Sequence, residues 1–138
     1  MKNYIVDASV ILKWVLEKEN EPDHDKATGL LHAWVRGEVG IAAPVLWTYE
    51  VANVLGRVLP DEAGQKMRLL LDLQISAVEC SEQMIRQCFT WMKEYRVTFY
   101  DAAYLAAAHA IDAVLLTSDE KFHEKMKNDE RICLLRNY

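Results

Sequence analysis

Four acidic residues are the side chains best suited to metal chemistry. Asp7 and Asp119 each follow within two residues of the end of a short apolar run, Asp101 lies in an alanine-rich segment, and Glu50 lies in an apolar one. Carboxylate oxygens are the ligands that Mg²⁺ and Mn²⁺ prefer, and gathered carboxylates repel one another unless a cation joins them. We therefore expect these four acids to form one metal-binding cluster.

The elements that must position these acids alternate between strands and helices. Short apolar runs predict buried strands, and apolar residues at helical spacing predict the helices between them. The expected strands cover residues 4–6, 40–43, 75–79, 113–117 and 132–135, and the expected helices cover 8–17, 22–36, 45–58, about 61–72, a stretch from 81, 98–110, and a short turn after 119. This order predicts an α/β fold, three layers (α/β/α) around a central, mostly parallel, five-stranded twisted sheet, in a single domain spanning 1–138.

The carboxyl ends of parallel strands meet at one edge of a sheet, where ligands bind. Asp7 and Asp119 are therefore expected side by side. Glu50 shares a helical face with Asn53 and Arg57, at positions i+3 and i+7. Asn53 either orients Glu50 or is satisfied within its own helix.

Each acid also has an ordinary structural explanation. Asp7 suits the N-cap of the helix that follows it. Thr98 and Asp101 match the spacing of a capping box, and Asp119 fits the first turn of a helix, where a negative charge is favoured. Glu50 has the option of simple exposure to solvent. These alternatives stay open at the level of sequence.

Hydroxyl groups lie next to two of the acids. Ser9 and Thr117 are positioned to donate hydrogen bonds to Asp7 and Asp119 or to bind water around a metal, and Ser118 has the same options as Thr117. Local helix capping is the competing explanation for all three.

Other polar and aromatic residues near the acids carry weaker signals. Lys13, Arg57, Arg96 and Lys121 are candidates for phosphate contacts, although a solvated surface charge is the favoured interpretation for each. Trp47 and Tyr100 are the better candidates for stacking on bases, whereas Trp14, Trp34, Trp91 and Phe89 fall on apolar stripes and are expected in packing. Cys80 and Cys88 are interpreted as buried reduced thiols, without a zinc site.

Bulk composition sets outer limits on function. The chain has 138 residues and a net charge of −5, which argues against nonspecific binding to nucleic acid unless bound cations reverse the local charge. No apolar stretch is long enough for a signal peptide or a membrane span, so we expect a cytoplasmic protein.

Four segments together carry a family resemblance. Residues 5–14 (IVDASVILKW), 49–55 (YEVANVL), 99–106 (FYDAAYLA) and 115–122 (LLTSDEKF) resemble, in order, the four motifs of PIN-domain ribonucleases. The short length is similar to that of VapC-type toxins from prokaryotic toxin–antitoxin pairs.

The resemblance implies an endoribonuclease that uses Mg²⁺ or Mn²⁺, with Asp7, Glu50, Asp101 and Asp119 as catalytic and metal-binding residues. It also implies an RNA substrate, a homodimer and inhibition by a small antitoxin protein. The alternatives are a PIN-domain nuclease of RNA processing that is not a toxin, and a catalytically silent α/β module that binds phosphate or metal. A phosphate-receiver domain is disfavoured because Asp7 has no acidic neighbour, and a haloacid-dehalogenase-type phosphatase because Ser9 stands where its second aspartate is needed.

Overall fold

The computed structural model describes all of residues 1–138 and is built on a parallel sheet. Its five strands lie in the order β3-β2-β1-β4-β5, and every neighbouring pair is parallel. The strands are β1 (Lys2–Val6), β2 (Val39–Pro44), β3 (Ser76–Val78), β4 (Val114–Thr117) and β5 (Ile132–Leu134). The expected five-stranded sheet is confirmed, and β1, which Asp7 directly follows, is central.

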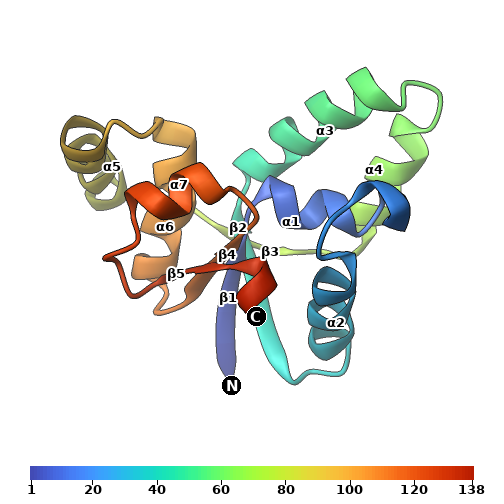
Figure 1. Cartoon of the computed structure of the whole chain (residues 1–138), viewed down its shortest axis with the longest axis horizontal. Coiled ribbons are helices and arrows are strands. Elements are labelled where there is room, and N and C mark those ends of the chain that lie inside the picture. Colours follow the sequence, from blue (N-terminus) through green and yellow to red (C-terminus); the bar gives the residue numbers. More distant parts are fainter.

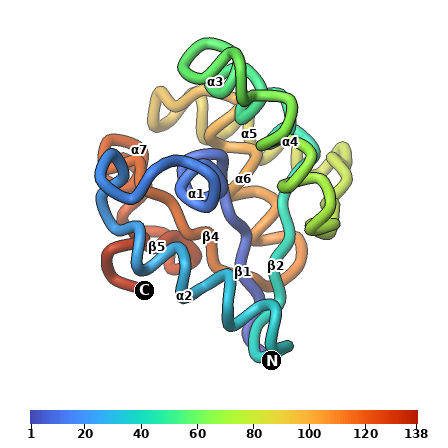
Figure 2. The backbone as a smooth tube through the Cα atoms, turned by 90° about the vertical axis from the view of Figure 1, so that its right-hand side faces the viewer, coloured from blue at the N-terminus to red at the C-terminus, as the bar shows by residue number.

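Seven α-helices cover the two faces of this sheet. They are α1 (Ala8–Lys13), α2 (His24–Val35), α3 (Leu46–Val58), α4 (Ala63–Asp72), α5 (Glu82–Tyr95), α6 (Phe99–Ala110) and α7 (Glu120–Lys125), with 3₁₀ turns η1 (Lys18–Asn20) and η2 (Leu135–Asn137). Figure 1 shows α1 to α4 on one side of the strands and α5 and α6 on the other, and Figure 2 shows the same layers turned by a quarter. The three-layer architecture is confirmed. None of the helices has both the length and the apolar character needed to span a bilayer.

The first helix is shorter than the sequence predicts. It ends at Lys13 instead of continuing to residue 17, and Trp14 is its C-cap. The indole Nε1 of Trp14 donates to the carbonyl oxygen of Ala27 at 2.9 Å, and its ring stacks on Trp34 of α2. Apolar spacing alone cannot distinguish a longer helix from this tertiary contact, which directs the chain toward α2.

Helix α6 is the apolar centre of the molecule. Every residue from Ala102 to Ala108 is buried, and the helix packs against β1, β2 and β4. Small side chains allow its backbone to approach the strands closely, because an alanine adds only one methyl group to the contact surface. The same helix carries Asp101 in its first turn, directly before this buried stretch.

The sequence prediction for the cysteines is partly wrong. Cys88 is buried on the inner face of α5, as expected, but Cys80 is exposed. Cys80 directly precedes Ser81, the N-cap of α5, and so lies in a surface loop before the apolar stripe begins. Among the aromatic residues, Trp91 is buried in packing as expected, whereas Phe89 is 59% exposed.

The close packing of α6 against the sheet predicts that a larger side chain on its buried face destabilises the fold. Replacing Ala107, which is fully buried, by leucine should cost about 1–3 kcal/mol of unfolding free energy, because the added carbons have no room against the sheet. Urea unfolding followed by circular dichroism measures the loss. The matched control is Ala110→Leu in the exposed last turn of the same helix, which should stay within about 0.5 kcal/mol. Equal stability of the two variants would contradict the tight contact.

Candidate active site

Asp7 lies at the carboxyl end of β1 and serves as the N-cap of α1. Its Oδ1 accepts a hydrogen bond from Ser9 Oγ at 2.5 Å and a longer one from the Val10 backbone amide at 3.3 Å. Its Oδ2 accepts from Thr117 Oγ1 at 2.5 Å. The capping role and the site role therefore belong to one carboxylate, and Ser9 and Thr117 donate to it directly.

The end of β4 brings Asp119 to the same edge. Residues Val6 and Leu116 are paired in the β1–β4 register, so the two strands end together. The Ser118 amide donates to Ser9 Oγ at 3.0 Å, and the Asp119 amide donates to Thr117 Oγ1 at 3.0 Å. The prediction that Asp7 and Asp119 lie side by side through parallel strand ends is consistent with this network.

Asp119 differs in detail from its expected place in a first helical turn. It is the N-cap of α7, and its Oδ1 accepts a hydrogen bond from the Phe122 amide at 2.9 Å. One carboxylate oxygen is thereby fixed toward the helix. The other, Oδ2, has no partner within the protein, and it is the oxygen of Asp119 available to a ligand.

Glu50 is half-buried on α3, and its partner is a residue that the sequence analysis did not single out. Tyr104 Oη donates to Glu50 Oε1 at 2.5 Å across 54 positions of sequence. Asn53 and Arg57 are exposed, and neither bonds Glu50. The signal that was available is spacing, since Tyr104 follows Asp101 at i+3 and so shares its helical face.

Asp101 lies in the first turn of α6, after the N-cap Thr98. The Asp101 amide donates to Thr98 Oγ1 at 3.1 Å, which confirms the capping interaction. The carboxyl pKa of Asp101 is raised chiefly by burial and then by the negative charges of Asp119 and Glu50, while Thr98 and the Lys125 ammonium act in the opposite direction. Asp101 is thus within electrostatic reach of two other acids.

Burial also dominates at Asp7. The pKa of its carboxyl is raised from 3.8 to about 6, mainly by desolvation and slightly by the charge of Asp101, against the lowering effect of the hydrogen bonds from Ser9, Thr117 and Val10. The four candidate acids are therefore linked electrostatically, and Asp101 is the member that connects the others. Such repulsion is what a bound cation would relieve.

The donor set fits a hard cation in chemistry, although the side chains are not drawn together as a ligand shell. No group of three His, Cys, Asp or Glu side chains is close enough to hold a metal ion. Both oxygens of Asp7 and one each of Glu50 and Asp119 are engaged by donors within the protein. Ser118, the residue before Asp119, has a buried Oγ that lacks a hydrogen-bond partner in the protein. A water molecule of a hydrated ion would supply that partner.

None of the four candidate acids lines either of two hollows on the surface of the protein. A cleft of about 570 Å³ runs from Ser9 along α1 to α3 and α4, and its lining includes Lys13. Lys13 was expected to be a solvated charge, but its side chain is 4% exposed and pairs with Glu21 at 3.3 Å. The prediction is wrong because Lys13, at the end of α1, is covered by the returning chain at Glu21 and neutralised by it.

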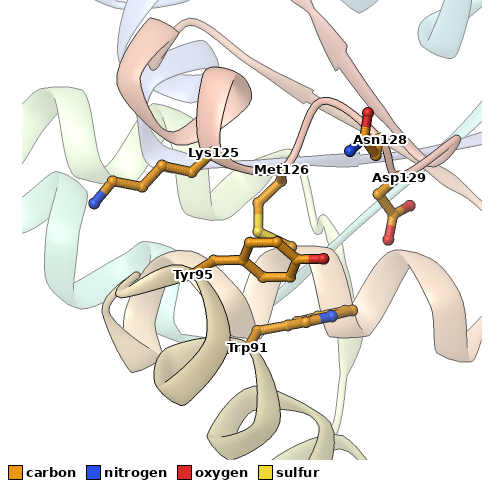
Figure 3. A pocket seen from close by; sticks show the side chains of 6 residues that line it. All are labelled: Trp91, Tyr95, Lys125, Met126, Asn128 and Asp129. Carbon is orange, nitrogen blue, oxygen red and sulfur yellow. The ribbon is translucent and has the colours of Figure 1, made fainter.

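The second hollow is a small cavity of about 150 Å³ between α5 and the end of α7. Figure 3 shows the Tyr95 ring lying above the Trp91 ring, with Met126 beside them and Lys125 extending away from Asp129. None of the four acids lines this cavity. Trp47, expected near the acids as a stacking candidate, is buried in the core, whereas Tyr100 is 59% exposed.

Comparison with known proteins places this geometry in context. The PIN domain family model matches residues 4–128. Ribonuclease VapC3 of Pyrobaculum aerophilum is 30% identical over 128 residues, which cover 88% of this chain and 92% of that protein. Ribonuclease VapC1 of Mycobacterium tuberculosis is 39% identical over 85 residues, which cover 57% of this chain and only 62% of that protein's length. A toxin–antitoxin complex from Klebsiella pneumoniae contains a chain of the same fold, with a TM-score of 0.71, 16% identity and coverage of 96% and 97% of the two chains.

The raised pKa of Asp7 predicts that its charge destabilises the fold in the absence of metal. Between pH 3.8 and about 6 the folded state binds more protons at this carboxyl than the unfolded state, so stability falls as pH rises through that window. Asp7→Asn keeps a good N-cap and removes the charge. In chelator, the variant should be more stable than the wild type at pH 7 by about 1–3 kcal/mol and should lose that advantage toward pH 4.

Chemical unfolding at a series of pH values tests this expectation. Asp72→Asn, at an exposed position at the end of α4, is the control and should follow the wild type at every pH. A stability difference between Asp7→Asn and the wild type that does not change with pH would show that the Asp7 pKa is not raised.

Proposed function

This chain belongs to the PIN domain family, and we propose that it is a metal-dependent endoribonuclease that hydrolyses phosphodiester bonds of RNA, with residues 1–138 acting as one nuclease domain. The observation that carries the proposal is the hydrogen-bonded junction of two parallel strand ends, where Thr117 bonds both the Asp7 carboxylate and the Asp119 amide, with Asp101 within electrostatic reach of Asp7, Asp119 and Glu50. The names of the relatives, ribonucleases VapC3 and VapC1, support RNA as the substrate.

In this proposal Asp7, Asp101 and Asp119 hold Mg²⁺ or Mn²⁺, directly or through water, and Glu50 shares in this. When bound, the ion would lower the pKa of a bound water and stabilise negative charge on the phosphate. The chain's own residues hold the carboxylates ready for this. Ser9 and Thr117 fix both oxygens of Asp7, and the Phe122 amide fixes one oxygen of Asp119.

The hydroxyl residues at the strand ends orient the neighbouring aspartates. Thr117 Oγ1 donates to Asp7 while it accepts from the Asp119 amide, so one side chain sets the spacing between the two acids. Ser118 leaves its buried Oγ free to bind a water beside Asp119. Asn53 is exposed on α3 and does not bond Glu50, so the orienting role falls to Tyr104 instead.

We also propose that the protein is the toxin of a VapBC-type pair, acting in the cytoplasm as a homodimer and inhibited by a small antitoxin. The VapC relatives and the toxin–antitoxin complex with the same fold support this assignment. A PIN-domain nuclease of RNA processing is the second candidate. A small neighbouring reading frame with a DNA-binding N-terminal part would favour the toxin, and a solitary gene would favour RNA processing.

Nuclease activity gives the decisive test. Purified wild-type protein should cleave mixed single-stranded RNA with Mn²⁺ or Mg²⁺ and should stop in chelator. Asp101→Asn should reduce the rate at least about 100-fold, because Asp101 is the acid that connects the other carboxylates electrostatically. Gel analysis of end-labelled RNA measures the rate, and circular dichroism checks that the variant is folded.

The control for that assay is again Asp72→Asn, which changes the same charge at an exposed position far from the acids in the chain and should cleave like the wild type. Equal cleavage by the wild type and Asp101→Asn would identify a contaminating nuclease and reject the proposed function. Cleavage that survives chelator would reject the metal.

A further inference from the structure

The hydroxyl of Tyr104 makes a contact that joins the two sides of the sheet. Tyr104 belongs to α6, Glu50 belongs to α3, and these helices lie on opposite sides of the strands (Figure 1). The bond from Tyr104 Oη to Glu50 Oε1 measures 2.5 Å, and the tyrosine is only 2% exposed. A buried phenol needs a hydrogen-bond partner, and Glu50 is the side chain that supplies it.

Glu50 needs this bond more than the other acids do. It is the fifth residue of α3, beyond the free amides of the first turn, and its own helix gives its carboxylate no donor. It is also repelled by Asp101, with which it interacts electrostatically. A half-buried glutamate with three rotatable bonds would relieve that repulsion by turning toward solvent. The Tyr104 hydroxyl is the group that opposes this movement.

We propose that Tyr104 is a positioning residue that holds Glu50 at the acidic edge and leaves Oε2 as its single free oxygen. This inference rests on the proposed function, in which Glu50 shares in metal binding. A phenol hydroxyl can donate a hydrogen bond whereas a carboxylate can only accept one, so Tyr104 is the donor in its bond to Glu50. Tyr104 does not touch RNA, because it is enclosed in the core beneath the site.

The variant that tests the contact is Tyr104→Phe, which keeps the ring in the core and removes only the hydroxyl. Calorimetry with Mn²⁺ alone should show affinity reduced about 10-fold to 100-fold, the range found when a group that orients a metal ligand is removed. The kcat for RNA cleavage should fall while KM stays near the wild-type value. Tyr49→Phe is the matched control, since its ring is 73% exposed on α3 and its hydroxyl bonds neither Glu50 nor Tyr104; it should change neither quantity.

A double-mutant cycle with Glu50→Ala separates positioning from a general loss of structure. If Tyr104 acts through Glu50, adding Tyr104→Phe to Glu50→Ala should weaken Mn²⁺ binding no further. Additive losses would overturn the inference, as would full Mn²⁺ affinity in Tyr104→Phe.

The same cycle measured by urea unfolding in chelator keeps the inference testable without metal. The two substitutions should again be non-additive in stability, because they remove the two halves of one contact. If the wild type neither binds Mn²⁺ nor cleaves RNA, the proposed function fails, and the unfolding cycle alone decides whether Tyr104 holds Glu50. Additivity there would show that the contact does not act in solution.

Discussion

Partial desolvation of the carboxylates at one edge of the sheet is the constraint on which the rest of this structure depends. Parallel pairing of β1 with β4 brings the positions of Asp7 and Asp119 to one edge of the sheet. Helix α6, which packs against these strands, adds Asp101 from its first turn. Burial, and to a smaller extent the neighbouring negative charges, raises the pKa values of Asp7 and Asp101, which opposes folding at neutral pH. The fold tolerates it because the hydrophobic core of the sheet and α6 outweighs a few kcal/mol of local electrostatic cost.

Donors around the acids are distributed according to where each acid lies. Asp7 and Asp119 are N-caps, so backbone amides of α1 and α7 face their carboxylates, and hydroxyls at the strand ends complete the set. The capping and metal-binding interpretations of the sequence were therefore not exclusive. A residue that caps a helix at the end of a parallel strand is already held in the place where a ligand would be bound.

Much of this arrangement was predictable from local pattern, and the exceptions share a physical cause. Apolar runs gave the five strands and the helix order, since both depend on residues close in sequence. The predictions for Lys13, Trp47 and Cys80 are wrong because the exposure of each side chain depends on whether a distant segment covers it, as the chain at Glu21 covers Lys13. Spacing places Tyr104 on the helical face of Asp101, but its bond to Glu50 is not predictable from local pattern, because the two residues are 54 positions apart on different helices.

The position of each acid in its helix explains why Glu50 alone needs a tyrosine to hold its carboxylate. Three lie at helix starts, where amides without partners and the helix dipole favour a negative charge. Glu50 alone lies inside a helix, where every nearby amide is already bonded to a carbonyl. A carboxylate in that position can be kept at the edge of the sheet only by a side chain from elsewhere. The phenol of Tyr104 extends from α6 through the hydrophobic core to Glu50 and brings no further charge into the site. A lysine or arginine in its place would compete with a cation for the same carboxylate oxygens.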